Sequence, residues 1–523
     1  MQILELSLPC ACRPRKPAQH RQRLISQKSP ESTPEEEESH ASTPISHQDL
    51  AMIVAAAVPE PSTRIASFFV GDGGYGAILD AIDPSSQRYF QIFAAAEKAL
   101  SIEDLEYLKV KGCFTLPECR AELLEAYFRY VHPTFPVIDA RSFLSQYAAK
   151  GFEGINLLLL WSIFSVSASY LPNIEGGRIA CKETYTARAK LLFDISHEND
   201  KTVLVQSALL ISFWYADTDD VKQSWYWTGV AFSIAQALGL HSKFDATSSE
   251  TMLKKEDTTW YNIWLCCFVR DVWQAFWKGR PVRLLTTVGV PSTQHDGAQL
   301  LTDLVLHGKL LYTPNEAKEI GRMWRTLVAV SNALREIITT KSPPSSTETE
   351  RLKTCFKHLP ESIPTPTPQH VVRHLQLYHC AARICLSRVT HEKIEARSAA
   401  DDMTSIVLSF LQQDTVTYAA PVTIPLLVPA IATYLAIWKT DREKMNEQLD
   451  VYGRFLAAVG DNHPAGMMLK MVVEAAQKVI VEKQGEVVRQ EDCSMALGGS
   501  ELYDFEQGGF FDVSWMDDSS LCI

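Results

Sequence analysis

The sequence predicts an all-α protein: one large helical array flanked by disordered N-terminal and C-terminal tails. Apolar residues recur at helical spacing through almost all of residues 64–485, and no convincing run of alternating strand residues interrupts them. Residues 1–63 are instead rich in Ser, Thr, Pro, Gln and Glu, a composition typical of disorder. The chain has 523 residues, 46% of them hydrophobic, which is enough to bury a large core. We therefore expect a disordered segment at 1–63, a helical domain at 64–485 and an acidic, aromatic tail at 486–523.

Two segments in the first half of the chain carry clear helix signals. The stretch "ELLEAYFRYVHP" (122–133) should end at His132-Pro133, and its apolar residues share one helical face: Leu123, Leu124, Tyr127, Phe128 and Val131. The stretch "SWYWTGVAFSIAQALGLH" (224–241) should also be helical, with Gly239 as its C-terminal cap. Small residues in that helix favour close packing against a neighbour: Gly229, Ala231 and Ala235.

The clearest helix is "TTWYNIWLCCFVRDVWQAFW" (258–277), which also carries an acidic residue on its apolar face. Asp271 lies seven residues after Trp264, so its carboxylate needs a cationic partner to offset the cost of desolvation. Arg280 is the leading partner, because the turn at Gly279 can fold the chain back. The alternatives are Arg283 and Arg270, the latter about 100° away around the helix. We predict that Asp271 and Arg280 form a buried pair with a structural role.

Several later segments interrupt the helical pattern. The stretches "KSPPSSTETE" (341–350) and "PESIPTPTPQ" (360–369) are predicted to be loops between helices. Residues 415–438 contain no charge and are long enough to cross a membrane, but prolines make their first half a poor helix: Pro421, Pro425 and Pro429. A buried segment of the helical core is the favoured interpretation, and no membrane partner is expected.

Basic residues are concentrated at the extreme N-terminus of a chain whose net charge is −12. Arg13, Arg15 and Lys16 belong to this basic segment, and the acidic run Glu35–Glu38 follows it. Any nucleic-acid contact should therefore be confined to the extreme N-terminus, since the net charge argues against a nucleic-acid surface along the whole chain. The alternative is a solvated tail or a nuclear-import signal.

The cysteines do not form a zinc site in this segment. Cys10 and Cys12 are separated by one residue, the next cysteine is Cys113, and a zinc site needs about four ligands. The chain contains no CxxC spacing, which suits reduced thiols in the cytosol or nucleus better than a disulfide framework.

Two motifs raise enzyme hypotheses. "GDGGYG" (71–76) matches GxGxxG, but Pro84 shortens the helix that should follow and no βαβ alternation appears, so a glycine-rich turn is favoured. "DTDD" contains Asp217, Asp219 and Asp220 in the DxDD pattern with which some terpene cyclases protonate a substrate. An acidic loop between helices is the favoured interpretation, and a helical terpenoid-type enzyme is the alternative function.

One group of metal-ligating residue types occurs late in the chain: His374, His379, Cys380 and Cys385. Helix positions five apart diverge by about 140°, so the two histidines should not face one metal. We expect packed core and surface residues there. The sequence predicts no catalytic residues, no metal site and no cofactor.

The C-terminal stretch mixes aromatic and acidic residues. Phe510, Phe511 and Trp515 alternate with Asp512, Asp517 and Asp518 in this tail. Acidic residues keep aromatic side chains solvated and available to a partner, which is typical of activation segments. A tail that docks on its own domain remains the alternative.

Three ordered stretches resemble the middle homology region of fungal zinc-cluster transcription factors. "LLEAYFRYVHPTFPVIDARSFLSQY" resembles the opening of that region, and "SWYWTGVAFSIAQALGLH" resembles its Trp-x-x-x-Gly-x-Ala helix ending in Leu-Gly-Leu-His. "WYNIWLCCFVRDVWQAFWKGRPVRL" resembles its signature of paired aromatics, then Arg-Asp, then Gly-Arg-Pro. The resemblance runs from about residue 64 to 440.

The resemblance implies a nuclear fungal transcriptional regulator, not an enzyme, of catabolic or secondary-metabolite genes. "CRPRK", with Arg13, Arg15 and Lys16, is similar to the start of the family's DNA-binding module, whose six cysteines hold two zincs. The other thiols are missing, so the zinc cluster is expected to be lost, degenerate or supplied by an upstream exon. The implied partners are the transcription machinery through the tail, DNA or a zinc-cluster protein, and a second copy of the chain.

Overall fold

The computed structural model describes residues 61–69, 89–95, 100–213 without 197 and 199, 223–244, 255–285, 288, 301–339, 345–357, 369–439 and 441–494. All of these residues belong to one compact unit, Ala51–Ile523. The described part of the chain is almost entirely helical, in agreement with the predicted all-α class.

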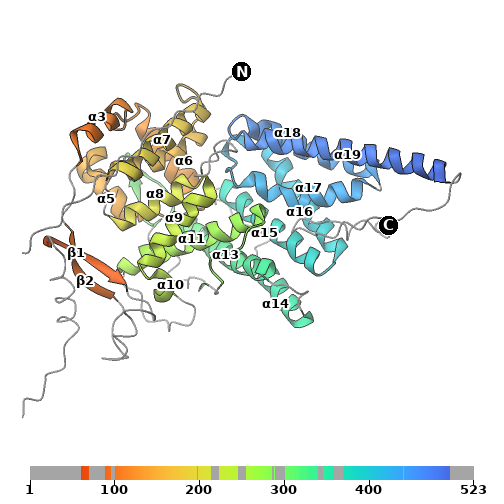
Figure 1. The fold of residues 1–523 in the computed structure, drawn as a ribbon, viewed down its shortest axis with the longest axis horizontal. Coiled ribbons are helices and arrows are strands. Elements are labelled where there is room, and N and C mark those ends of the chain that lie inside the picture. The colour runs from red at the N-terminus through yellow and green to blue at the C-terminus, as the bar shows by residue number, and fades with distance from the viewer. Residues whose placement is uncertain are drawn as a thin grey trace, which may run out of the picture. The chain divides into compact units, whose positions relative to one another are not determined.

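The helices follow one another in chain order across the body (Figure 1). The first group comprises α3 (Ile102–Val110), α4 (Arg120–Ala126), α5 (Ala140–Lys150), α6 (Leu157–Ser167), α7 (Arg178–Ile195), α8 (Lys201–Ile211), α9 (Ser224–Ala237), α10 (Leu240–Lys243) and α11 (Lys255–Lys278). The second group comprises α13 (Pro314–Thr339), α14 (Ser346–Lys357), α15 (Gln369–Val389), α16 (Lys393–Gln412), α17 (Thr423–Trp438), α18 (Arg442–Gly460) and α19 (Ala465–Ser494). In Figure 1, α11, α13 and α15 lie between the orange-to-yellow helices and the blue ones.

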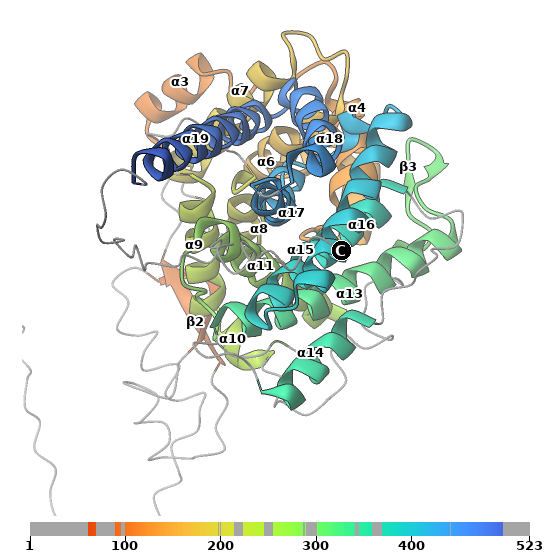
Figure 2. The ribbon, with the colours of Figure 1, turned by 90° about the vertical axis from the view of Figure 1, so that its right-hand side faces the viewer.

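The core is centred on helices that are buried on every face. In α11 every residue from Tyr261 to Phe276 is buried, and α6 is buried from Leu158 to Ser167. A helix with no polar face must be surrounded by other elements. Figure 2 looks nearly along α17, another largely buried helix, and shows α15, α16, α18 and α19 around it.

Side-chain caps fix where several of these helices begin. The side-chain oxygens of Asp139, Asn156 and Asp200 accept backbone N–H bonds at the starts of α5, α6 and α8. Each cap satisfies donors that the first helical turn leaves without an internal partner. At the end of α9, Gly239 takes the left-handed conformation with φ of 72°, as predicted for its C-terminal cap.

The first predicted helix ends in an irregular turn. After α4 the chain forms a π-helix, η1 (Tyr127–Val131), in which the backbone N–H of His132 donates to the carbonyl of Tyr127 at 3.0 Å. The helix stops at His132-Pro133, as predicted. Tyr130 in this turn stacks on Tyr170 at 5.1 Å and on Tyr418 at 4.8 Å between ring centroids. The π-helix is thereby connected to two segments that are distant in sequence.

Three local predictions are wrong. Strands β1 (Pro61–Phe69) and β2 (Tyr89–Ala95) pair antiparallel inside the range predicted to be helical, and a second short hairpin joins β3 (Val305–Leu306) to β4 (Lys309–Leu310). Helix α14 begins at Ser346 inside the predicted loop 341–350, because Ser345 and Glu348 form a reciprocal cap at its start. Helix α19 runs to Ser494, past the predicted boundary at 485.

The prolines of 415–438 disturb the helix less than predicted. Helix α17 begins at Thr423, so Pro425 lies in the first turn, where its missing N–H is not needed. Only Pro429 lies inside the helix. Within the described residues no single helix is long and apolar enough to cross a membrane, although one strongly bent pair, Ala140–Gly154 with Leu157–Tyr170, meets that test by length and composition.

Candidate functional site

Asp271 lies at the centre of an ion pair between α11 and the chain that follows it. Its side chain is buried completely, as predicted, but its partner is Arg283 and not Arg280. The backbone N–H of Arg283 donates to Oδ2 at 2.7 Å, and the guanidinium donates to Oδ1. Burial raises the pKa of Asp271, and the bonds from Arg283 oppose that rise.

The path of the chain after α11 explains why Arg280 was the wrong prediction. Gly279 adopts a positive φ of 60°, and the N–H of Arg280 bonds back to the carbonyl of Ala275 at 3.0 Å. The backbone of Arg280 therefore forms part of the turn, which directs its side chain away from Asp271. That side chain is exposed, and its guanidinium lies 5.3 Å from the ring centroid of Trp225. Only after the turn does the chain return along α11 and bring Arg283 to Asp271.

Arg283 also holds α9 in place. Its guanidinium lies 3.7 Å from the ring centroid of Trp225 and donates to the carbonyl of that residue at 3.0 Å. Gly229 leaves the space for it, because a Cβ at that position would lie 3.2 Å from Nη2 of Arg283. Gly229, which was predicted to favour close packing against a neighbouring helix, therefore accommodates the guanidinium of Arg283. The charges of Asp271 and Arg283 satisfy one another in this cluster.

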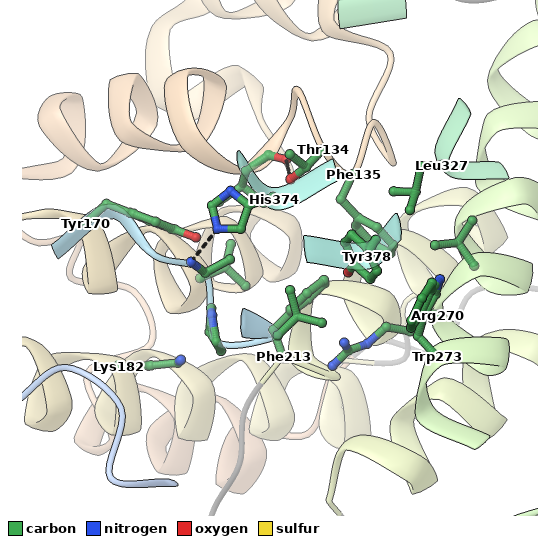
Figure 3. A pocket seen from close by; sticks show the side chains of 16 residues that line it. Thr134, Phe135, Tyr170, Lys182, Phe213, Arg270, Trp273, Leu327, His374 and Tyr378 are labelled. Carbon is green, nitrogen blue, oxygen red and sulfur yellow. Dashed lines mark hydrogen bonds between the residues drawn. The ribbon is translucent and has the colours of Figure 1, made fainter. Parts of the chain in front are cut away.

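A second set of charged groups lines a pocket of about 40 Å³ in the middle of the body (Figure 3). The lining includes Lys182 from α7, Arg270 from α11 and His374 from α15, among mostly apolar neighbours. The pocket has room for only one or two water molecules. We call it the central pocket.

Arg270 lies inside the central pocket with its hydrogen bonds made to neighbouring helices. Its Nε donates to the hydroxyl of Ser212 at 3.0 Å, and Nη2 donates to the carbonyl of Ser212 at 2.6 Å and to the hydroxyl of Ser224 at 3.2 Å. The guanidinium lies 4.0 Å from the ring centroid of Phe213. Arg270 thus connects the end of α8 with the start of α9.

Lys182 is a buried cation that the sequence analysis missed. It is 5% exposed, and burial, with the nearby charge of Arg270, lowers the pKa of its ammonium to about 8. Figure 3 shows Lys182 and Arg270 entering from opposite sides of the pocket. The signal was present in the sequence, because the buried residues of α7 follow helical spacing: Lys182, Tyr185, Thr186, Ala189 and Leu192.

His374 is held in one orientation by two backbone groups. Its Nε2 accepts from the N–H of Ala420 at 2.9 Å, and its Nδ1 lies 2.6 Å from the carbonyl of His370. Burial lowers the pKa of His374 to about 4, so the ring is neutral near pH 7. The hydrogen bond from Ala420 connects α15 to the segment that leads into α17.

The residues around His374 do not gather into a metal site. Cys380 and Cys385 are buried on α15, and burial raises the pKa of each thiol to about 12, which keeps both protonated. Among the residues that the structure describes, no three His, Cys, Asp or Glu side chains are placed to hold a metal ion. The arrangement favours packing and binding over nucleophilic chemistry.

The remaining predicted site residues lie outside the described part of the chain: Arg13, Arg15, Lys16, Asp217, Asp219, Asp220, Phe510, Phe511 and Trp515. Their roles stay predictions. The glycine motif at 71–76 also lies outside it.

The part of the chain that contains the ion pair is similar to known proteins. Residues 124–296 match the fungal specific transcription factor domain. The chain is 36% identical over 195 residues to the cutinase transcription factor 1 beta of Fusarium vanettenii, covering 35% of this chain and 22% of that protein. It is 33% identical over 210 residues to the acetamidase regulatory protein of Aspergillus fumigatus, covering 38% of this chain and 27% of that protein. It is 30% identical over 189 residues to the transcription factor cpaR of Aspergillus oryzae, covering 33% of this chain and 30% of that protein.

The match therefore spans less than a third of the length of each of these relatives. Among solved structures, the K. lactis CBF3 core aligns with a TM-score of 0.44 at 13% identity over 76% of this chain and 98% of that one, too weak a likeness to support a conclusion. Lys182, Arg270, Asp271 and Arg283 all lie within residues 124–296. Residues 124–296 are therefore similar to the fungal specific transcription factor domain and contain these four charged residues.

Proposed function

We propose that this protein is a fungal transcriptional regulator that controls a metabolic or biosynthetic gene set in the nucleus. The observation that carries the proposal is the match of residues 124–296 to the fungal specific transcription factor domain. The similar proteins are named as transcription factors and regulatory proteins, two of them after the enzymes cutinase and acetamidase. The genes controlled by this chain are not specified by those names.

Two terminal segments supply the contacts that such a regulator needs. The basic segment with Arg13, Arg15 and Lys16 would contact DNA phosphates, or the chain would reach DNA through a zinc-cluster partner protein. The tail with Phe510, Phe511 and Trp515 would bind the transcription machinery through its aromatic side chains. The helical body between them would regulate the tail.

No observation favours the terpenoid-type enzyme. Its candidate residues Asp217, Asp219 and Asp220 are not described by the structure, and the similar proteins are named for transcription. We therefore propose a role in regulation and not in catalysis.

A fusion of residues 495–523 to an unrelated DNA-binding domain tests the proposal. The fusion should activate a reporter gene, and replacing Phe510, Phe511 and Trp515 by Ala should abolish activation, because apolar burial provides the partner contact. Replacing Ser514, Ser519 and Ser520 by Ala is the matched control and should leave activation unchanged. An inert fusion, or equal loss in both variants, would contradict the proposed role of the tail.

A further inference from the structure

A larger pocket lies next to the central pocket and shares two lining residues with it. It has a volume of about 290 Å³, and Lys182 and Pro421 border both pockets. It forms where α7, the end of α11, the start of α17 and the turn between α18 and α19 meet. Its lining residues are Ile179, Lys182, Trp277, Lys278, Pro421, Ile424, Pro425, Val428, Asn462, His463, Pro464, Ala465 and Leu469. We call it the outer pocket.

The outer pocket is mostly apolar, and two lysines are among the residues that line it. Lys182 is 5% exposed and borders the central pocket as well, whereas Lys278 is half-buried. Burial lowers the pKa of Lys278, with Arg280 and Arg270 adding to the effect. None of the described residues that line the pocket is a carboxylate. Two ammonium groups in an apolar environment attract an anion more strongly than they would in water.

His463 offers a third polar group. Its side chain is 5% exposed, and within the described part of the chain its Nε2 has no hydrogen-bond partner. The carbonyl of Ala419 accepts a hydrogen bond from the ring, which fixes its orientation. The adjacent Asn462 accepts a bond from the guanidinium of Arg178, which holds the turn against α7. Burial lowers the pKa of His463 well below its ordinary value, so the ring is neutral and Nε2 is an acceptor, which a hydrogen-bond donor satisfies and a carboxylate does not.

The volume sets the size of the ligand. An apolar cavity of about 150 Å³ accommodates benzene, so a pocket of about 290 Å³ has room for roughly a dozen heavy atoms. Apolar side chains such as Ile424, Val428 and Leu469 would contact most of such a molecule.

We infer that the outer pocket binds a small monocarboxylic acid with an apolar body of about a dozen heavy atoms. Its carboxylate would lie between Lys182 and Lys278, and its body would pack against α17 and α19. Such a ligand would connect α7 and α11 to the α18–α19 turn, and α19 leads into the tail. Binding of the ligand does not depend on the proposed function, but the use of the ligand as a regulatory signal does.

Calorimetric titration of the full chain with decanoate tests the site, with decan-1-ol as a neutral probe of similar length. We expect one molecule of decanoate per chain, with a dissociation constant on the order of 10 µM, and binding of decan-1-ol about tenfold weaker or more. Lys182→Met and Lys278→Met should each weaken decanoate binding, the former by about tenfold or more. Lys470→Met removes a lysine next to the lining residue Leu469 and should have no effect.

The outcomes separate the site from the proposed function. Equal binding of decanoate and decan-1-ol, absence of binding, or equal affinity in Lys278→Met and Lys470→Met would overturn the site. Lys278 is only half-buried, so its substitution keeps the test valid if Lys182→Met fails to fold. Decanoate binding together with an inert tail fusion would instead retain the site and contradict the proposed regulator.

Discussion

Adjacent residues of α11 carry opposite charges and contact different neighbours. Arg270 contacts the end of α8 and the start of α9, whereas Asp271 contacts Arg283 in the chain after α11. Consecutive residues of a helix lie about 100° apart, so the two charges do not neutralise each other. Each charge is buried and therefore needs its own set of partners. Together they connect α11 to two helices, α8 and α9, and to the loop that follows α11.

Removing Arg283 should destabilise the fold strongly. Arg283→Met leaves the carboxylate of Asp271 buried without its cation, and we expect a loss of about 3–5 kcal/mol in the free energy of unfolding. Chemical denaturation followed by circular dichroism would measure the loss. Arg280→Met is the matched control: it removes an exposed guanidinium and should cost less than about 1 kcal/mol. Equal losses in both variants would show that the pair does not hold this loop.

The sequence predicted the burial of Asp271 but not its partner, for a physical reason. Burial follows from helical periodicity, which is visible within one segment. The partner depends on the path of the chain after Gly279, where the positive φ and the bond to Ala275 commit Arg280 to the turn. Lys182 was missed although its spacing marks the apolar face of α7, because a lysine is rarely expected to be buried.

At the scale of elements, α18 and α19 approach each other closely at the start of α19. A Cβ on Gly466 would lie 2.6 Å from Cγ1 of Val459 and 2.8 Å from the carbonyl of Leu456, so only glycine allows α18 and α19 to approach this closely. The turn just before Gly466 contains His463, so this contact also positions one wall of the outer pocket.

Adding one methyl group at this crossing should separate the two helices. Gly466→Ala should lower the free energy of unfolding by about 1–3 kcal/mol, because backbone atoms of α18 must move. Gly453→Ala is the control in α18, where no atom lies within 4 Å of the new Cβ, and it should be neutral or stabilise by about 0.5–1 kcal/mol. Thermal unfolding would measure both. A Gly466→Ala protein as stable as Gly453→Ala would contradict the close crossing.

Elements with strong periodicity were predicted well and irregular ones were not. Helix α9 lies within its predicted segment and α11 includes the whole of its predicted segment, because their apolar residues follow one period over many turns. The π-helix at Tyr127–Val131 changes the hydrogen-bond pattern without changing the sequence pattern, so periodicity does not reveal it. The hairpin of β1 and β2 was missed because two short apolar runs resemble buried helix segments in isolation.

At the scale of the whole molecule, the outer pocket combines residues that lie far apart in the sequence. Lys182, Lys278 and His463 come from different helices and a turn. Such a site follows only from the packing of α7, α11, α17 and α19, so no local motif predicts it. The family resemblance, in contrast, rests on local motifs, and the match of residues 124–296 agrees with it.

The central claim is that the chain regulates transcription through its tail, and a tethered reporter tests it most directly. The full chain is fused to an unrelated DNA-binding domain in a fungal host, and reporter expression is compared with that of a fusion ending at residue 494. We predict activation by the full chain and its loss in the shorter fusion, with equal amounts of both proteins. A reporter that responds to neither fusion, or equally to both, would contradict the claim.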